Sequence, residues 1–206
     1  MDLRDALSQI DQIRQQMAQT QTFRGYRAAT TAFSGAVAFV AAGAQGYLLP
    51  QPLQTPIAYL AIWLSAALIS VTAFTIELAL RYRRTRVAVQ RQLILLAAEA
   101  LLPAIIAGGL LTITIVRFAP ASFWMLPGLW GIIFSLGVFA SRRLLANAVF
   151  WVGAFYLLAG VSCLIFAQDE AALSPWTMGL MFGVGQLLAA IILYWNLERP
   201  HGHKSE

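Results

Sequence analysis

Charged residues, cysteine and histidine are all scarce in this sequence. Of its 206 residues, 11% are charged and 59% are hydrophobic. Soluble globular domains contain about 25% charged and about 45–50% apolar residues, so this chain has too few charges to cover a water-facing surface. Its single cysteine, Cys163, excludes a disulfide within the chain, and its high apolar content excludes a disordered protein. A protein that crosses the membrane several times remains.

The residue types that usually carry catalysis or bind metals are also missing from the apolar part. The only histidines, His201 and His203, lie within the last six residues. The sequence contains no Gly-x-Ser-x-Gly, phosphate-binding loop, His-Glu-x-x-His or paired-cysteine motif. An enzyme would need a nucleophile with a base, or a metal. We therefore expect no enzymatic activity, no cofactor and no metal site.

Long uncharged runs predict six membrane-spanning helices. A span takes roughly 20 residues, because a helix rises about 1.5 Å per residue and the bilayer core is about 30 Å thick. The longest run lies between Arg27 and Glu77 and is broken by Pro50, Pro52 and Pro56, which predicts two spans separated by a turn. The predicted all-α transmembrane domain covers 28–197, with spans at 28–49, 57–80, 92–116, 118–141, 144–168 and 173–197.

The distribution of basic residues predicts the orientation of these spans. Thirteen of the fourteen lysines and arginines fall on one side, and Arg117 alone falls on the other. Lysine and arginine in short loops are retained in the cytoplasm. We therefore expect both termini, including the tail 198–206, in the cytoplasm, and three hairpins that each leave it and return. The net charge of +5 reflects this asymmetry and requires no nucleic-acid partner.

Residues 2–21 predict a cytoplasmic amphipathic helix within the segment 1–27 that precedes the first span. Residues 1–22 carry a net charge of −1, whereas anionic membrane surfaces attract basic helices. We therefore expect this helix to contact protein, either by self-association or by docking on a partner; the alternative is an inert cap on the bundle. The contact residues would be its apolar stripe, Leu3, Leu7, Ile10, Ile13 and Met17.

The juncture Phe23-Arg24-Gly25-Tyr26-Arg27 joins this helix to the first span. With the stripe from Ile10 to Met17 before it and Ala28–Gly35 after it, the juncture resembles a family of uncharacterised bacterial multi-pass inner-membrane proteins. The resemblance covers roughly residues 5–45. It implies a location in a bacterial inner membrane, and it transfers no functional residue because the family has no assigned activity.

Four polar side chains in or near the spans are candidate functional residues. Glu77 lies four residues before Arg81, which favours a structural ion pair on one helix face. Glu99 lies eight residues past Arg91 between leucines; a carboxylate against lipid is unfavourable, so we expect it to face the bundle. There it either finds a structural partner or belongs to a proton or cation pathway, which Gln186 and Gln45 would join.

Small residues at a spacing of four predict where helices approach closely, because lipid supplies no hydrophobic drive for helix association. Packing within one chain is the expected role, and a subunit interface through the sixth span is the alternative. When the sequence is aligned with itself at an offset of 52 residues, Ala107-Gly108 falls on Ala159-Gly160. This match is consistent with an internal duplication or with chance. The predicted packing residues are Ser34, Ala38, Ala42, Gly46, Gly179 and Gly183.

Two functions follow from these features. The first is a non-enzymatic membrane protein that anchors or senses for a cytoplasmic partner, through residues 2–21 and the basic loop between Arg81 and Arg91. The second is a small proton- or cation-linked carrier centred on Glu99. The scarcity of further intramembrane carboxylates favours the first, because a coupled carrier usually needs more than one titrating group.

Overall fold

The computed structural model describes residues 28–84, 88–141 and 148–198, and these residues form helices and no strands. Six of these described helices are long and apolar enough to cross a membrane, which is the number that the sequence predicts and supports a multi-pass membrane protein. The first three spans are α2 (Ala28–Leu48), α3 (Pro56–Arg84) and α4 (Ala88–Phe118). The fourth joins the short 3₁₀ helix η1 (Pro120–Met125) to α5 (Leu126–Ser141), and the fifth is α6 (Val149–Phe166).

The sixth span is the least regular. It begins with α7 (Pro175–Met178), passes through the π-helical segment η3 (Gly179–Val184), continues as α8 (Gly185–Leu193) and ends in a second π-helical segment, η4 (Tyr194–Glu198). A π-helical turn holds one more residue than an α-helical turn, and such turns are often found at functional sites.

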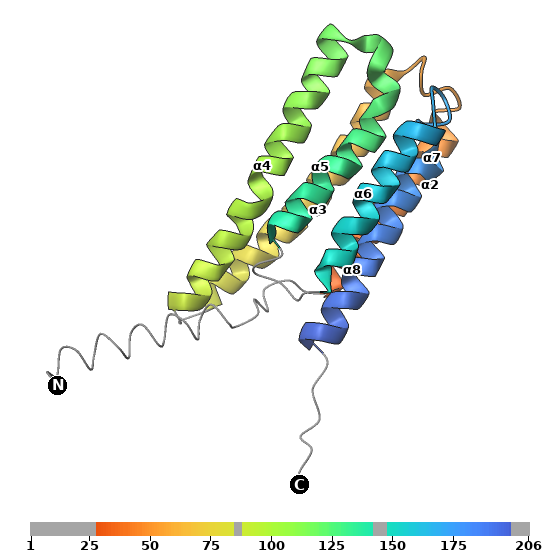
Figure 1. Cartoon of the computed structure of the whole chain (residues 1–206). Coiled ribbons are helices and arrows are strands. Elements are labelled where there is room, and N and C mark those ends of the chain that lie inside the picture. The colour runs from red at the N-terminus through yellow and green to blue at the C-terminus, as the bar shows by residue number, and fades with distance from the viewer. Residues whose placement is uncertain (1–27, 85–87, 142–147, 199–206) are drawn as a thin grey trace, which may run out of the picture.

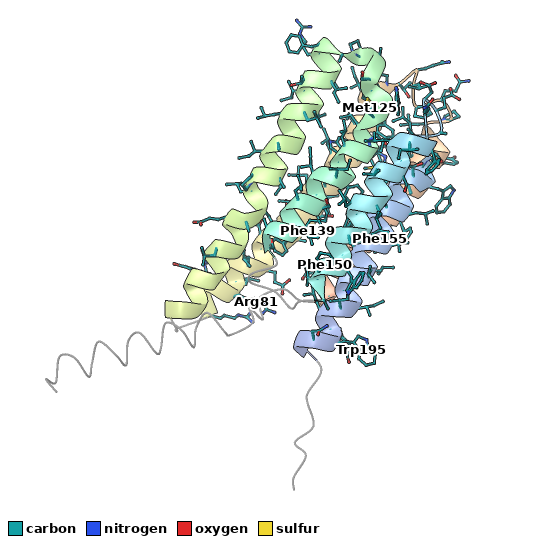
Figure 2. The ribbon with its side chains drawn as sticks, in the orientation of Figure 1. Arg81, Met125, Phe139, Phe150, Phe155 and Trp195 are labelled. Carbon is teal, nitrogen blue, oxygen red and sulfur yellow. The ribbon has the colours of Figure 1, made fainter. Side chains whose placement is uncertain are left out.

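The two ends of the bundle differ in composition. At one end α3 finishes with Arg81, Arg83 and Arg84, and we call this the arginine-bearing end. Figure 2 shows Arg81 there, with Met125 near the opposite end. The three spans that begin at the opposite end all start with a proline, Pro56, Pro120 or Pro175. Proline suits the first position of a helix because the N–H that it lacks would have no partner within the helix.

The spans are not packed equally (Figure 1). α5 and α6 share the most extensive contact, and α4 packs mainly against α5. α2 packs against α3 and against the sixth span, so the first and sixth of the described spans are neighbours. α3 and α4 touch each other only sparsely, and α4 lies at the edge of the bundle with most of its surface exposed.

Glycines bring α5 and α6 close together. A Cβ on Gly160 would lie 2.6 Å from the carbonyl oxygen of Gly128 and 2.9 Å from the backbone nitrogen of Ile132. A Cβ on Gly128 would likewise lie 2.8 Å from the carbonyl oxygen of Gly160. Because these obstructing oxygen and nitrogen atoms belong to the backbone, they cannot rotate away, and a side chain at either position would push the two helices apart.

Most of the predicted packing residues lie between α2 and the sixth span. Ala38 and Ala42 are buried, Ser34 is half-buried, and Gly46 is exposed but lies beside Pro175. A Cβ on Gly179 would lie 2.7 Å from the Cβ of Ala42, and one on Gly183 would lie 2.6 Å from the ring of Phe39. Gly179 and Gly183 therefore pack against α2 of the same chain.

The contact between α5 and α6 predicts a sharp difference between two glycine substitutions. Gly160→Ala should lower the free energy of unfolding by about 1–3 kcal/mol, the usual cost of overpacking a core. Gly109→Ala is the matched control, because nothing lies within 4 Å of a Cβ added to that glycine of α4. Unfolding in detergent by denaturant, followed by circular dichroism, measures both; equal stability of the two variants would contradict the packing described.

Candidate functional site

Polar side chains of the described spans form contacts between helices at three heights along the bundle, which we call levels. One level lies at the arginine-bearing end, one in the middle, and one at the opposite end. Each level joins two consecutive spans, and a separate hydrogen bond from Nε1 of Trp130 to Oγ1 of Thr112 joins α5 to α4. The residues that define the levels are Thr30, Glu77 and Arg81 at the first, Tyr156 and Gln186 at the second, and Gln45 and Trp63 at the third.

At the arginine-bearing end, Glu77 joins α2 to α3. Its Oε1 accepts from Nε of Arg81 and lies 3.2 Å from both Nε and Nη2 of that residue. Its other oxygen, Oε2, accepts a hydrogen bond from the hydroxyl of Thr30 on α2. The ion pair is the one that the spacing of four residues predicted, whereas Thr30 was not foreseen. The carboxylate therefore orients Arg81 and ties the beginning of α2 to α3.

Glu99 does not face the bundle, so that expectation is wrong. Its side chain is exposed on α4. The face of α4 that packs inward contains Leu101 and Ala104, which lie 3.4 and 3.0 Å from a Cβ built on Gly137 of α5. Glu99 lies on another side of the helix.

The level of Glu99 explains how a carboxylate can be exposed there. Ala104 is beside Gly137, and the two helices run in opposite directions. Glu99 is five residues before Ala104, and Ser141, the last described residue of α5, is four residues after Gly137. Glu99 is thus level with Ser141, which directly precedes Arg142 and Arg143 in the sequence, toward the arginine-bearing end where water or lipid headgroups can solvate a carboxylate.

Two helices extend beyond this level. α3 continues for seven residues after Glu77, or about 10 Å, and α4 begins eleven residues before Glu99, or about 16 Å. Glu77 itself is level with Thr30, near the first described residue of α2. Within the described residues α3 and α4 therefore continue past the level of Glu77 and Glu99, and Arg83 and Arg84 are exposed on this part of α3.

In the middle of the bundle, Tyr156 of α6 is fully buried against the sixth span. Its ring packs on Phe134 and Phe182, with centroid separations of 4.7 and 5.5 Å. Its hydroxyl donates a long hydrogen bond, 3.5 Å, to the carbonyl of Phe182 within η3, and the side chain of Gln186 lies beside it. Gln186 is therefore an interhelical contact to α6.

At the opposite end, Gln45 is a fully buried hub. Its Oε1 accepts a hydrogen bond from Nε1 of Trp63 at 2.7 Å, and its Nε2 donates to the carbonyl of Leu173 at 2.6 Å. It thus joins α2, α3 and the loop before α7. The neighbouring Tyr59 is also fully buried, and its hydroxyl has no hydrogen-bond partner among the described residues.

The remaining candidates do not meet at one place. Glu77, Glu99, Gln186 and Gln45 lie at three different levels and have no common partner in the described chain. The proposed contact residues Leu3, Leu7, Ile10, Ile13 and Met17 lie outside the described residues. Within residues 28–84, 88–141 and 148–198, no group of three or more histidine, cysteine, aspartate or glutamate side chains is placed to hold a metal ion.

Sequence reasoning missed Tyr156, Thr30 and Tyr59. Tyr156 and Tyr59 are aromatic residues in apolar helices, where nothing in the local sequence separates a buried tyrosine from one that anchors the span at the membrane interface. Comparison with protein-family models, with curated proteins and with solved structures finds no match to this chain.

The hub at Gln45 predicts a large effect of a single substitution. Gln45→Leu should lower the free energy of unfolding by about 1–3 kcal/mol, because the buried Nε1 of Trp63 loses its acceptor. Gln54→Leu, at an exposed position of the loop between α2 and α3, is the control. Thermal unfolding in detergent, followed by tryptophan fluorescence, distinguishes them; a variant as stable as the control would show that the hub contributes little.

Proposed function

We propose that this protein is a non-enzymatic interaction, anchoring or sensing module for a cytoplasmic partner, embedded in a bacterial inner membrane. The proposal takes the six spans as three hairpins with both termini in the cytoplasm, and it takes residues 2–21 as an amphipathic helix that contacts protein. Thirteen of the fourteen basic residues on one side of the spans support this orientation.

The exposed arginines at the end of α3 are the observation that carries the proposal. In the proposed orientation α3 and α4 continue about 10 and 16 Å past the level of Glu77 and Glu99, toward the cytoplasm. A helix needs no such extension to cross the bilayer, as α6 shows with 18 residues. The end of α3 presents Arg83 and Arg84, which are exposed and suited to an acidic surface on a protein partner.

The position of α2 supports a shared contact surface. α2 begins with Ala28, and Thr30 is hydrogen-bonded to Glu77, so the chain joins the bundle at the arginine-bearing end. The segment that precedes α2, with its net charge of −1 over residues 1–22, is therefore attached beside the exposed arginines. The same partner can contact both, or the segment can itself compete for the arginines.

The carrier alternative has less support. Gln45 and Gln186 are engaged in contacts between helices, and Glu99 lies on the outer side of α4. A pathway through the bundle would need polar groups that follow one another across the membrane, whereas these three residues lie at separate levels.

Cross-linking in native membranes tests the proposal. We expect the intact protein to yield a specific cross-linked species with a protein partner, and we expect deletion of residues 2–21 to abolish it while the bundle stays folded. The paired change of Arg83→Gln with Arg84→Gln should weaken the species severalfold, because the charge complementary to the partner is lost.

Arg117→Gln is the matched control, since Arg117 is an exposed arginine at the opposite end of the bundle. It should leave the cross-linked species unchanged. Terminal tags, probed for accessibility from the outside, show whether each variant keeps its orientation. The proposal fails if the intact protein gives no specific species, or if the deletion variant gives the same species as the intact chain.

A further inference from the structure

The π-helical segment η3 is held by contacts that only glycine permits. Gly185 follows η3 directly, and a Cβ on it would lie 2.5 Å from Cζ and 2.6 Å from the hydroxyl oxygen of Tyr156. Gln186, the next residue, faces Gly35 of α2, where a Cβ would lie 3.2 Å from the Cβ of Gln186. The contact with Tyr156 and the contact with Gly35 both depend on which residue of the sixth span lies at that height along the helix.

A π-helical turn and an α-helical turn place different residues at those positions. Because η3 holds one more residue per turn, its conversion to α-helix would carry one residue into the helix that follows. Each position downstream would then be occupied by the residue one earlier in the sequence. In the α-helical form Val184, instead of Gly185, would lie against Tyr156. Gly185, instead of Gln186, would lie against Gly35.

We propose that the sixth span has two helical registers and that Tyr156 selects between them. In the π register, Gly185 lies against Tyr156 and no side chain obstructs the ring. In the α register, Val184 would bring its isopropyl group to a position that has no room for a Cβ. Tyr156 is fully buried between Phe134 and Phe182, so its ring has little freedom to move aside. The sixth span therefore stays in the π register. It can adopt the α register when the side chain at position 184 no longer clashes with Tyr156.

The two registers expose different residues of α8. Ala190 is 6% exposed, whereas the next residue, Ile191, is 56% exposed. A shift by one would therefore carry Ala190 from a buried position to an exposed one. Ile192 is half-buried and Leu193 is 5% exposed, so the same shift would carry Ile192 to a buried position. Exposure thus changes in opposite directions at two residues of one helix, which a general loosening of the helix cannot produce.

Cysteine labelling of the full-length protein in detergent micelles tests this inference, which does not rest on the proposed function. Ala190→Cys or Ile192→Cys is introduced into a Cys163→Ala background, and the rate of reaction with N-ethylmaleimide is followed by intact mass. Val184→Gly should raise the labelling rate at position 190 about tenfold and lower it at position 192, because a glycine fits against Tyr156 in the α register.

Val184→Ala is the matched control. Val184 is partly exposed, so both substitutions remove a similar contact with the surroundings, but alanine retains the Cβ that Tyr156 excludes. The control should therefore label at the rates of the background protein at both positions, with helix content by circular dichroism unchanged in all variants. Equal rates for the glycine and alanine variants, or rates that rise at both cysteines, would overturn the two-register inference.

Discussion

Direct contact between helix backbones is the constraint on which this bundle depends. Lipid is as apolar as the side chains that it surrounds, so helices associate through close packing and hydrogen bonds rather than through exclusion of water. The contact of Gly128 with Gly160 sets the distance between α5 and α6, and Gly35 with Gly183 does the same between α2 and the sixth span. Where glycine is absent from such contacts, as along most of α3 and α4, the helices remain largely exposed.

The polar side chains follow from the same constraint. A buried polar group is costly unless it is paired within the protein, and Gln45 and Glu77 each pair with a residue from another helix, whereas the hydroxyl of Tyr59 has no partner among the described residues. Each of these contacts fixes the relative height of two helices, which apolar packing alone specifies poorly. Glu99 escapes the requirement because it lies on the side of α4 that faces away from Leu101 and Ala104, the residues that pack against α5.

The sequence predicts the local features of this protein better than the relations between its helices. Runs of apolar residues broken by charges and prolines were sufficient to count six spans, and a spacing of four residues was sufficient for the ion pair of Glu77 with Arg81. The orientation of Glu99 was not predictable, because α4 is apolar on all sides and shows no amphipathic pattern to mark its inner face.

Equivalent positions in the sequence can also have different surroundings. Gly108 aligns with Gly160 when the sequence is compared with itself at an offset of 52 residues. Gly160 packs against the backbone of α5, whereas nothing lies within 4 Å of a Cβ built on Gly108. The π-helical turn in the sixth span likewise has no local signature. It follows from the positions of Tyr156, Gly35 and their neighbours, which are known only once the helices are assembled.

The contact between α2 and the sixth span has a consequence for the biogenesis of the protein. Gly35 and Gly183 are separated by nearly 150 residues, so the sixth span is synthesised long after α2. Domains generally form in the order of synthesis, so α2 is inserted before its neighbour exists. Until then the alanine- and glycine-lined side of α2 must remain covered by lipid or by an insertion factor, and arrival of the sixth span completes this contact.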